Sequence, residues 1–163
     1  MARKIIVKHS TVHGNGVFAA RDLPSGTELI EYTGRLITPK QADRLYPNEM
    51  ESGHTFLFAL NDEWIIDGNV DGNDARWFNH GCAPNCIPYL YEDATDRRKD
   101  RVFIETMRDV RKGEELTYDY GICFEVRHTA RLKKIWACRC GVPNCSGTML
   151  KPKDHVRRLI VPA

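Results

Sequence analysis

The sequence has 163 residues, a usual length for one domain and enough to bury a hydrophobic core. Hydrophobic residues make up 42% and charged residues 28%, an ordinary globular composition that excludes a largely disordered chain. The 24 Lys and Arg against 22 Asp and Glu give a net charge of +2, too balanced for a protein that mainly wraps nucleic acid. The N-terminal segment and the short apolar runs predict neither a signal peptide nor a membrane span, so we expect an intracellular protein.

Short strands dominate the predicted secondary structure. Segments rich in Ile, Val, Leu and aromatic residues alternate with turn chemistry, such as a Pro-Ser-Gly turn and the hairpin centre Asn61-Asp62. A polar loop of residues 92–100 joins two later strands. The predicted strands are residues 4–9, 26–32, 55–60, 63–67, 87–91, 101–106 and 115–118.

Two short helices are expected between the strands. Thr38 can cap a helix in which Pro39 takes the first position and Gln41 completes a capping box. This helix should end before Pro47, because the residue before a proline avoids helical backbone. Residues 127–135 form the second predicted helix.

Many short strands with few helices are typical of an α+β fold class that is mainly β, and not of alternating β-α-β units. We find no internal repeat, low-complexity stretch or linker. The one change in composition is a cysteine-bearing tail from residue 137. The sequence therefore predicts one domain with a small C-terminal appendage.

The six cysteines all lie in the second half of the chain. Clustered cysteines in an intracellular protein indicate a metal site or catalysis, because a reducing interior does not preserve disulfides. Cys138, Cys140 and Cys145 lie close together in a loop shaped by Gly and Pro, which suits a tetrahedral zinc site; unligated buried cysteines are the alternative. The candidates for a fourth ligand are Cys82, Cys86, Cys123 and the histidines.

Three further segments have a composition typical of binding or catalysis. The glycines around His13 allow close backbone approach to a ligand, although a plain turn is the commoner explanation of such a segment. Residues 71–86 are dense in donors and acceptors, which favours a site over an ordinary loop with Trp77 in the core. Tyr118 and Tyr120 lie on one face of a strand, either lining an aromatic channel or forming a cross-strand pair.

Taken together, these segments resemble the SET-domain protein lysine methyltransferases, in the order found in that family and from about residue 6 to about residue 150. Gly81 stands where the family usually has serine, which loosens a turn but removes no proposed ligand. Phe56 stands where many relatives have tyrosine. The matching segments are His13-Gly14-Asn15-Gly16-Val17-Phe18, residues 72–85, residues 115–120, and the cysteines at 138, 140 and 145.

The resemblance implies a SET fold of small sheets with a C-terminal pseudoknot over residues 1–136, and a post-SET zinc-binding tail over residues 137–163. It implies a structural zinc ion held by Cys82, Cys138, Cys140 and Cys145. It also implies S-adenosylmethionine as cofactor. The implied cofactor-binding residues are His13, Gly14, Asn15, Phe56, Asn79, His80 and Arg139.

By the same resemblance, Tyr120 is the catalytic phenol and Tyr118 lines the lysine channel. The implied reaction is methyl transfer to a lysine amine of a protein substrate, with a histone tail as the leading candidate. A phenol at Tyr118 predicts mainly monomethyl-lysine. The expected compartment is the nucleus in a eukaryote, and the cytoplasm or a host cell for a bacterial protein.

Two alternatives compete with this function. The first is a non-catalytic, zinc-stapled protein-interaction module that keeps the fold. The second is a nucleic-acid binder that uses Arg97-Arg98-Lys99 and Arg157-Arg158. Because Asp96 and Asp100 flank the first basic run, we expect a solvated loop and no sequence-specific nucleic-acid binding.

Overall fold

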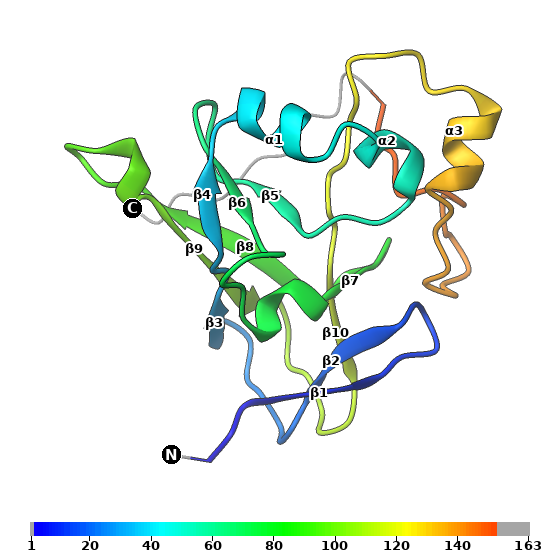
Figure 1. The fold of residues 1–163 in the computed structure, drawn as a ribbon. Helices are drawn as coiled ribbons and strands as arrows, with labels where there is room; N and C mark the ends of the chain where they lie inside the picture. The colour runs from blue at the N-terminus through cyan, green and yellow to red at the C-terminus, as the bar shows by residue number, and fades with distance from the viewer. Residues whose placement is uncertain (1, 153–163) are drawn as a thin grey trace.

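A computed structural model of the chain describes residues 2–152, in which small β-sheets form most of the structure (Figure 1). No helix in this range is both long and apolar enough to cross a membrane. The strands are β1 (Ile5–His9), β2 (Asn15–Ala19), β3 (Glu28–Glu31), β4 (Arg35–Ile37), β5 (Leu57–Ala59), β6 (Ile65–Asp67), β7 (Asn79–His80), β8 (Cys86–Tyr91), β9 (Arg101–Thr106) and β10 (Glu115–Tyr118). The helices are α1 (Pro39–Leu45), α2 (Glu49–Ser52) and α3 (Ala130–Ile135), with 3-10 turns η1 (Asp74–Trp77) and η2 (Arg97–Lys99).

The strands form three sheets, with the orders β1-β2-β10-β7, β3-β9-β8 and β4-β6-β5. Every pairing is antiparallel except that of β10 with β7, which is parallel. The predicted fold class, α+β and mainly β, is thereby confirmed. The late strand β10 lies between the earlier strands β2 and β7, the insertion that the expected pseudoknot requires.

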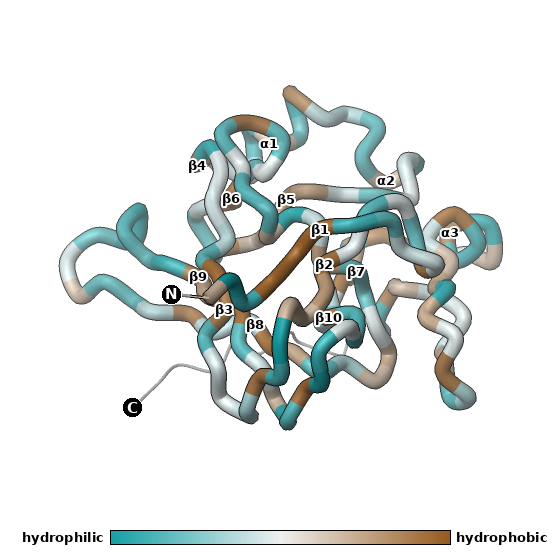
Figure 2. The backbone as a smooth tube through the Cα atoms, turned by 90° about the horizontal axis from the view of Figure 1, so that it is seen from below, coloured by the Kyte–Doolittle hydropathy of each residue, from teal (hydrophilic) through white to brown (hydrophobic). Residues whose placement is uncertain are grey.

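The main core lies where the three sheets face one another. Figure 2 shows the apolar stretches of the central strands in brown, while the projecting loop between β8 and β9 is mostly teal. Leu116 on β10 and Ile104 on β9 are completely buried, as the alternation along a half-buried strand requires. Three further hydrophobic residues of this core have no solvent exposure: Val17, Val102 and Ala75.

Helix α1 begins as the sequence predicts. The Thr38 hydroxyl accepts a hydrogen bond from the Gln41 N–H, and the Gln41 side chain accepts one from the Thr38 N–H at 2.8 Å. The helix ends at Leu45, before Pro47. Helix α3 begins only at Ala130, three residues later than the expected start, because the Thr129 hydroxyl caps its N-terminus.

Four short strands and helices are absent from the sequence prediction: β2, β4, β7 and α2. Strand β2 includes Gly16, which weakens any strand signal and made the segment look like a turn. Strand β4 has three residues and α2 has four, too few for a periodic pattern to stand out.

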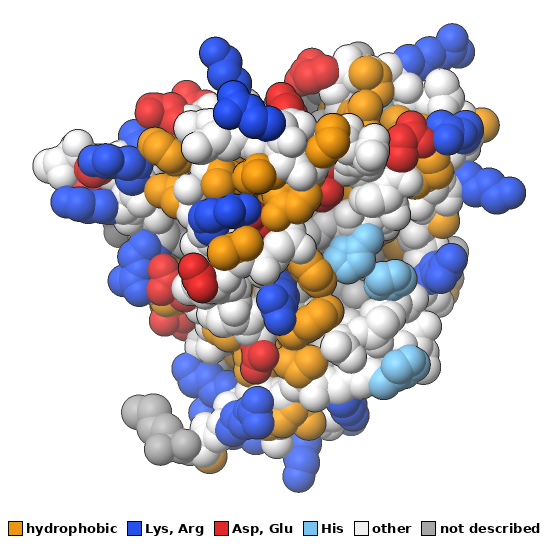
Figure 3. Space-filling model, viewed as in Figure 1, with side chains coloured by type: hydrophobic (Ala, Val, Ile, Leu, Met, Phe, Trp, Pro, Cys, Tyr) orange, Lys and Arg blue, Asp and Glu red, His pale blue; other side chains and the backbone are white. Residues whose placement is uncertain are grey.

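The basic run between β8 and β9 is neutralised by its neighbours. Arg98 pairs with Asp96 at 2.8 Å, and Arg97 pairs with Asp62 at 2.9 Å. Figure 3 shows Lys and Arg side chains scattered over the displayed face without one continuous basic patch. These ion pairs agree with the solvated loop that the sequence predicts. The second basic run considered there, Arg157-Arg158, lies outside the described residues.

A second, smaller core joins α3 to the tail. Leu132, Trp136 and Leu150 are its buried members. The Trp136 indole N–H donates to the Met50 carbonyl at 2.8 Å, which fastens this core to α2. The division into residues 1–136 and 137–163 stays a prediction, and this small core takes residues from both sides of it.

A buried carboxylate fastens α1 to the sheet of β4, β5 and β6. Asp67 is inaccessible to solvent and accepts hydrogen bonds from Arg35 at 2.7 Å, from the Tyr46 hydroxyl at 2.8 Å, and from the backbone and side chain of Asn69. Burial alone would raise the pKa of Asp67, but these donors outweigh it and the pKa is lowered. The carboxylate is therefore ionised, and its partners hold α1 in place.

Replacing Tyr46 by Phe should lower the free energy of unfolding by about 1.5 kcal/mol, the usual contribution of a hydrogen bond to a charged group. Because the folded-state pKa of Asp67 lies below the unfolded value of about 3.9, this stabilisation should be complete above that pH and lost as the pH falls through the folded-state pKa. Urea unfolding at several pH values measures both effects. Tyr91→Phe, which alters an exposed tyrosine, is the matched control and should change stability by less than about 0.5 kcal/mol.

Candidate active site

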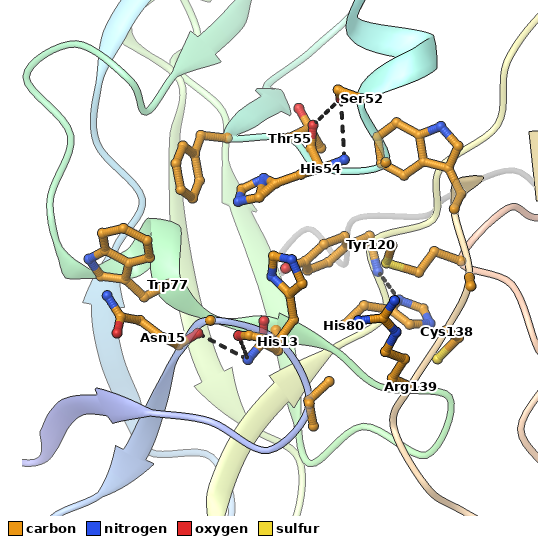
Figure 4. A pocket seen from close by; sticks show the side chains of 18 of the residues that line it. His13, Asn15, Ser52, His54, Thr55, Trp77, His80, Tyr120, Cys138 and Arg139 are labelled. Carbon is orange, nitrogen blue, oxygen red and sulfur yellow. Dashed lines mark hydrogen bonds between the residues drawn. The ribbon is translucent and has the colours of Figure 1, made fainter. Parts of the chain in front are cut away.

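A cavity of about 280 Å³ opens between the β1–β2 loop, the α2–β5 loop and the C-terminal tail (Figure 4). Every residue predicted to bind the cofactor lines this cavity, as does Tyr120. The structure therefore brings together segments that lie more than 100 residues apart in the sequence. The predicted cofactor residues on its walls are His13, Gly14, Asn15, Phe56, Asn79, His80 and Arg139.

The β1–β2 loop forms one wall through its backbone. Gly14 has a φ of +47°, a left-handed conformation that glycine adopts without strain. The Asn79 side-chain amide donates to the carbonyls of His13 at 3.2 Å and Asn15 at 3.1 Å. Asn79 is buried, so it fixes the shape of this loop from beneath.

Glu115 joins this wall to β10. Its carboxylate accepts from the Ser10 hydroxyl at 2.8 Å and from the Asn79 amide at 2.8 Å. A Cβ atom at Gly16 would collide with this carboxylate, so the second glycine of the loop is needed for close approach. The side chains of Ser10, Asn79 and Glu115 form one connected polar network behind the wall of the cavity.

His80 connects the cavity to the cysteine cluster. Its Nδ1 accepts a hydrogen bond from the Tyr120 N–H at 3.1 Å, which leaves the proton of the neutral ring on Nε2. Nε2 lies 3.7 Å from Cys82 Sγ and can donate to that sulfur. One imidazole therefore orients the backbone at Tyr120 and contacts a candidate metal ligand.

Two tyrosines from β10 and the following turn separate the cavity from a second, smaller one. The rings of Tyr118 and Tyr120 lie 5.1 Å apart, and the Tyr120 hydroxyl donates to the Phe78 carbonyl at 2.5 Å. Burial, with a smaller effect of Tyr118, raises the pKa of Tyr120 well above its ordinary value, so it is a neutral phenol at physiological pH.

The second cavity has a volume of about 30 Å³ and is mostly aromatic and aliphatic. It shares Thr55, Arg76 and Tyr120 with the larger cavity, so the two meet at these residues. The other residues that line it are Tyr32, Leu57, Phe58, Tyr118 and Ile122.

The four predicted zinc ligands lie together. The Sγ atoms of Cys82, Cys138, Cys140 and Cys145 are all within 4.8 Å of one another. A tetrahedral zinc ion with Zn–S bonds of about 2.3 Å separates its sulfurs by about 3.8 Å. The Cys82–Cys138 and Cys82–Cys145 separations of 3.6 and 3.9 Å fit this donor set. Cys86 and Cys123, which we expect to be free, lie outside the cluster.

The cluster favours thiolates at two positions. Burial opposes ionisation of Cys82, but hydrogen bonds from Ser146 and His80 lower its pKa to about 7. The pKa of Cys140 is also lowered to about 7, mainly by the Val142 N–H against the opposing effect of burial. Thiolates are the form that binds metal.

Gly81 lies in a tightly packed turn, whereas the sequence predicted that a glycine at this position would loosen the turn. A Cβ atom at this position would lie 2.5 Å from the Thr117 hydroxyl, closer than real contacts allow. Thr117 on β10 therefore occupies the space that a larger residue would need, and the turn is tightly packed.

Sequence reasoning missed several residues that line the larger cavity, among them His54 and Arg76. His54 precedes β5 without a recognisable motif, so no local pattern pointed to it. Arg76 lies inside the signature segment, but its side chain reaches the junction of the two cavities only because η1 turns the chain there.

Comparisons with known proteins agree with this geometry. A sequence model of the family described as "SET domain" matches residues 14–121. Histone-lysine N-methyltransferase 2D of Homo sapiens is 38% identical over 144 residues, covering 86% of this chain and 2% of that protein. Histone-lysine N-methyltransferase ATX2 of Arabidopsis thaliana is 37% identical over 150 residues, covering 90% of this chain and 13% of that protein.

A solved structure, "ctPRC2 in an autoinhibited conformation bound to S-adenosylmethionine", superposes with a TM-score of 0.63 at 28% identity. The match covers 74% of this chain and 15% of the solved one. The chain therefore spans a small part of the length of each protein it resembles.

We expect one zinc ion per chain, held by the four clustered cysteines. Cys82→Ser should lower the zinc content well below one per chain, because a hydroxyl is a poor replacement for a thiolate. Cys86→Ser is the matched control and should keep full zinc, since this buried thiol lies outside the cluster. Elemental analysis of the purified proteins measures the content; full occupancy in Cys82→Ser would contradict the assignment.

Proposed function

Because the chain belongs to the SET domain family, we propose that it is a protein-lysine N-methyltransferase that uses S-adenosylmethionine. The named relatives are histone-lysine N-methyltransferases, and the similar solved structure contains S-adenosylmethionine. The relatives are much longer proteins, so their activities and substrates are applied to this chain as a proposal. The observations that support it come from the geometry of the two cavities.

The observation that supports methyl transfer most directly is the junction of the two cavities at Thr55, Arg76 and Tyr120. Transfer of a methyl group between two substrates requires that both reach one point from opposite sides. A larger polar cavity that meets a small aromatic one has this arrangement. A module that only binds a partner needs no such junction.

The residues of the larger cavity fit the proposed cofactor. Its walls offer a glycine backbone at Gly14, amide and imidazole groups at Asn79 and His80, and the indole of Trp136. These groups can bind an amino acid moiety and a purine, which need hydrogen bonds and apolar surface respectively. S-adenosylmethionine would supply the methyl group as part of a positively charged sulfonium.

The small cavity would prepare the lysine amine. A free lysine has a pKa of about 10.4, so only a minute fraction is neutral and able to attack at physiological pH. The aromatic walls at Tyr32, Phe58 and Tyr118 would exclude water and disfavour the ammonium form, and the guanidinium of Arg76 adds like-charge repulsion. These residues would also direct the amine toward the junction.

Tyr120 would position reacting groups and not act as a base. Its hydroxyl proton is donated to the Phe78 carbonyl, and its raised pKa keeps the phenol neutral. The hydroxyl oxygen is fixed at the junction of the cavities, where it can orient the reacting groups.

A histone tail is the proposed substrate, because the named relatives act on histone lysine. This substrate would place the activity in a nucleus, or in a host cell if the protein is delivered there. The alternative remains the zinc-stapled interaction module. Labelled S-adenosylmethionine, incubated with the protein and either histones or a cell extract, separates the two, because only an enzyme labels protein lysine.

Tyr120→Phe should lower kcat by more than about tenfold while the affinity for S-adenosylmethionine stays nearly constant. The hydroxyl is proposed to act on the transition state, so its loss affects kcat more than binding. Turnover assays together with calorimetric cofactor binding test this. Near-normal turnover would reject the role of Tyr120.

Asn79→Ala should weaken the binding of S-adenosylmethionine, in contrast to Tyr120→Phe, which should lower kcat and leave this affinity nearly constant. Its side chain holds the His13 and Asn15 carbonyls, so its removal releases the β1–β2 loop. We expect a loss of at least about tenfold in affinity, corresponding to 1.4 kcal/mol for two lost hydrogen bonds. Calorimetry measures it, and unchanged affinity would contradict the proposed role of Asn79.

We propose that Tyr118 limits the product mainly to monomethyl-lysine. Tyr118 is buried against Phe58 and Phe78, so its phenol takes space in the small cavity. Tyr118→Phe should shift the product toward di- and trimethyl-lysine, because the phenol would hydrogen-bond the lysine nitrogen and oppose addition of a second methyl group. Loss of one such hydrogen bond, about 1 kcal/mol, changes the rate of the second transfer by about fivefold. Mass spectrometry of the methylated peptide gives the ratio. Trimethyl-lysine as the main wild-type product would refute this.

A further inference from the structure

His54 lies at the opening of the larger cavity and has no role in the proposed reaction. Its ring is 5.3 Å from that of His13 at 75°, and 4.4 Å from that of Phe56 at 82°. In Figure 4, His13 and His54 come from opposite walls and point toward each other. Histidine side chains also reach the surface beside one another in Figure 3. The two imidazoles are therefore in edge-to-face contact and together form part of the wall of the cavity in which the cofactor would bind.

The charged side chains on the walls of this cavity are all basic. Arg76 and Arg139 line it, and none of the lining residues that the structure describes is an Asp or Glu. The Glu115 carboxylate lies behind Asn79 and is already used by Ser10 and Asn79. A positively charged ligand therefore meets no opposing carboxylate, and its retention depends on how much further positive charge the walls carry.

Burial, together with the neighbouring His13, lowers the pKa of His54. His54 is therefore uncharged at neutral pH. Other titratable groups near it are Glu49 on α2, whose pKa is raised by burial, and the phenol of Tyr120. His80 also lines the cavity, where its Nδ1 accepts a hydrogen bond from the Tyr120 N–H.

We propose that His54 is a further cofactor-binding residue and that, facing His13, it sets the preference of the site for a cationic sulfonium ligand over the neutral thioether left after methyl transfer. This inference rests on the proposed use of S-adenosylmethionine. An uncharged imidazole presents a ring and a lone pair to a cation, whereas a protonated one repels it. The thioether product, S-adenosylhomocysteine, has lost the sulfonium charge, so protonation of His54 affects it less.

The test compares the dissociation constants of S-adenosylmethionine and S-adenosylhomocysteine by calorimetry. Measurements at about pH 8 and about pH 5.5 lie on either side of the ordinary histidine pKa of about 6.5. In the wild-type protein, acidification should weaken S-adenosylmethionine binding at least about fivefold more than S-adenosylhomocysteine binding, as expected for one added like charge near the protein surface. In His54→Gln, which cannot be protonated, the two ligands should change in parallel.

His128→Gln is the matched control. His128 lies outside the cavity, where its ring nitrogen contacts the Phe124 backbone, so this variant should behave like wild type. Any acid-induced loss of metal from the cysteine cluster would weaken both ligands in every variant and leave their ratio unchanged. NMR titration of the histidines gives a second readout, since S-adenosylmethionine should lower the pKa of His54 further when it binds.

Two results would overturn the inference. In the first, acidification changes the dissociation constants of both ligands equally in the wild-type protein. In the second, the ratio of the two dissociation constants changes with pH in His54→Gln as much as in the wild type. A different result would overturn the proposed function itself: folded protein that binds neither ligand even at about pH 8. The two failures are therefore distinguishable in one data set.

Discussion

The carboxylate of Glu115 ties together three segments beside the larger cavity: the β1–β2 loop, β7 and β10. It bonds to Ser10 at the start of the β1–β2 loop and to Asn79 on β7, while its own strand, β10, leads directly to Tyr118 and Tyr120. A charged group in this half-buried position is tolerated because its oxygens are satisfied by donors. The same network demands a glycine at position 16, since any Cβ there would displace the carboxylate.

Two cavities with different linings lie beside this network. The larger one presents backbone, amide and imidazole groups, whereas the smaller one presents aromatic rings. A phenol at Tyr120, held by the Phe78 carbonyl, stands at their meeting point. The division matches the different needs of a polar cofactor and of a lysine amine that must lose water before it reacts.

Much of this could be predicted from the sequence, for identifiable reasons. The capping box at Thr38 is local, so the sequence predicts it. The spacing of the tail cysteines predicts a metal site with its fourth ligand open, and the family resemblance adds Cys82, which the structure places in the cluster. The hydrogen bonds of Asp67 to Arg35 and Tyr46 join residues more than 20 positions apart and leave no local pattern. His54 was missed for the same reason, because only the folded chain brings its ring to His13. Long-range polar contacts therefore escaped prediction, as did the shortest strands and helix, whose few residues give no periodic pattern.

The position of Cys82 has a consequence for how the protein assembles. Cys82 and Cys138 are 56 residues apart, so a metal held between them would close a long loop whose chain entropy costs about 3.6 kcal/mol. Cys138 and Arg139 also form a wall of the larger cavity. Completion of that wall would then follow metal capture as a late step in folding. The cellular supply of the metal, as well as the sequence, would set how many chains reach a cofactor-competent state.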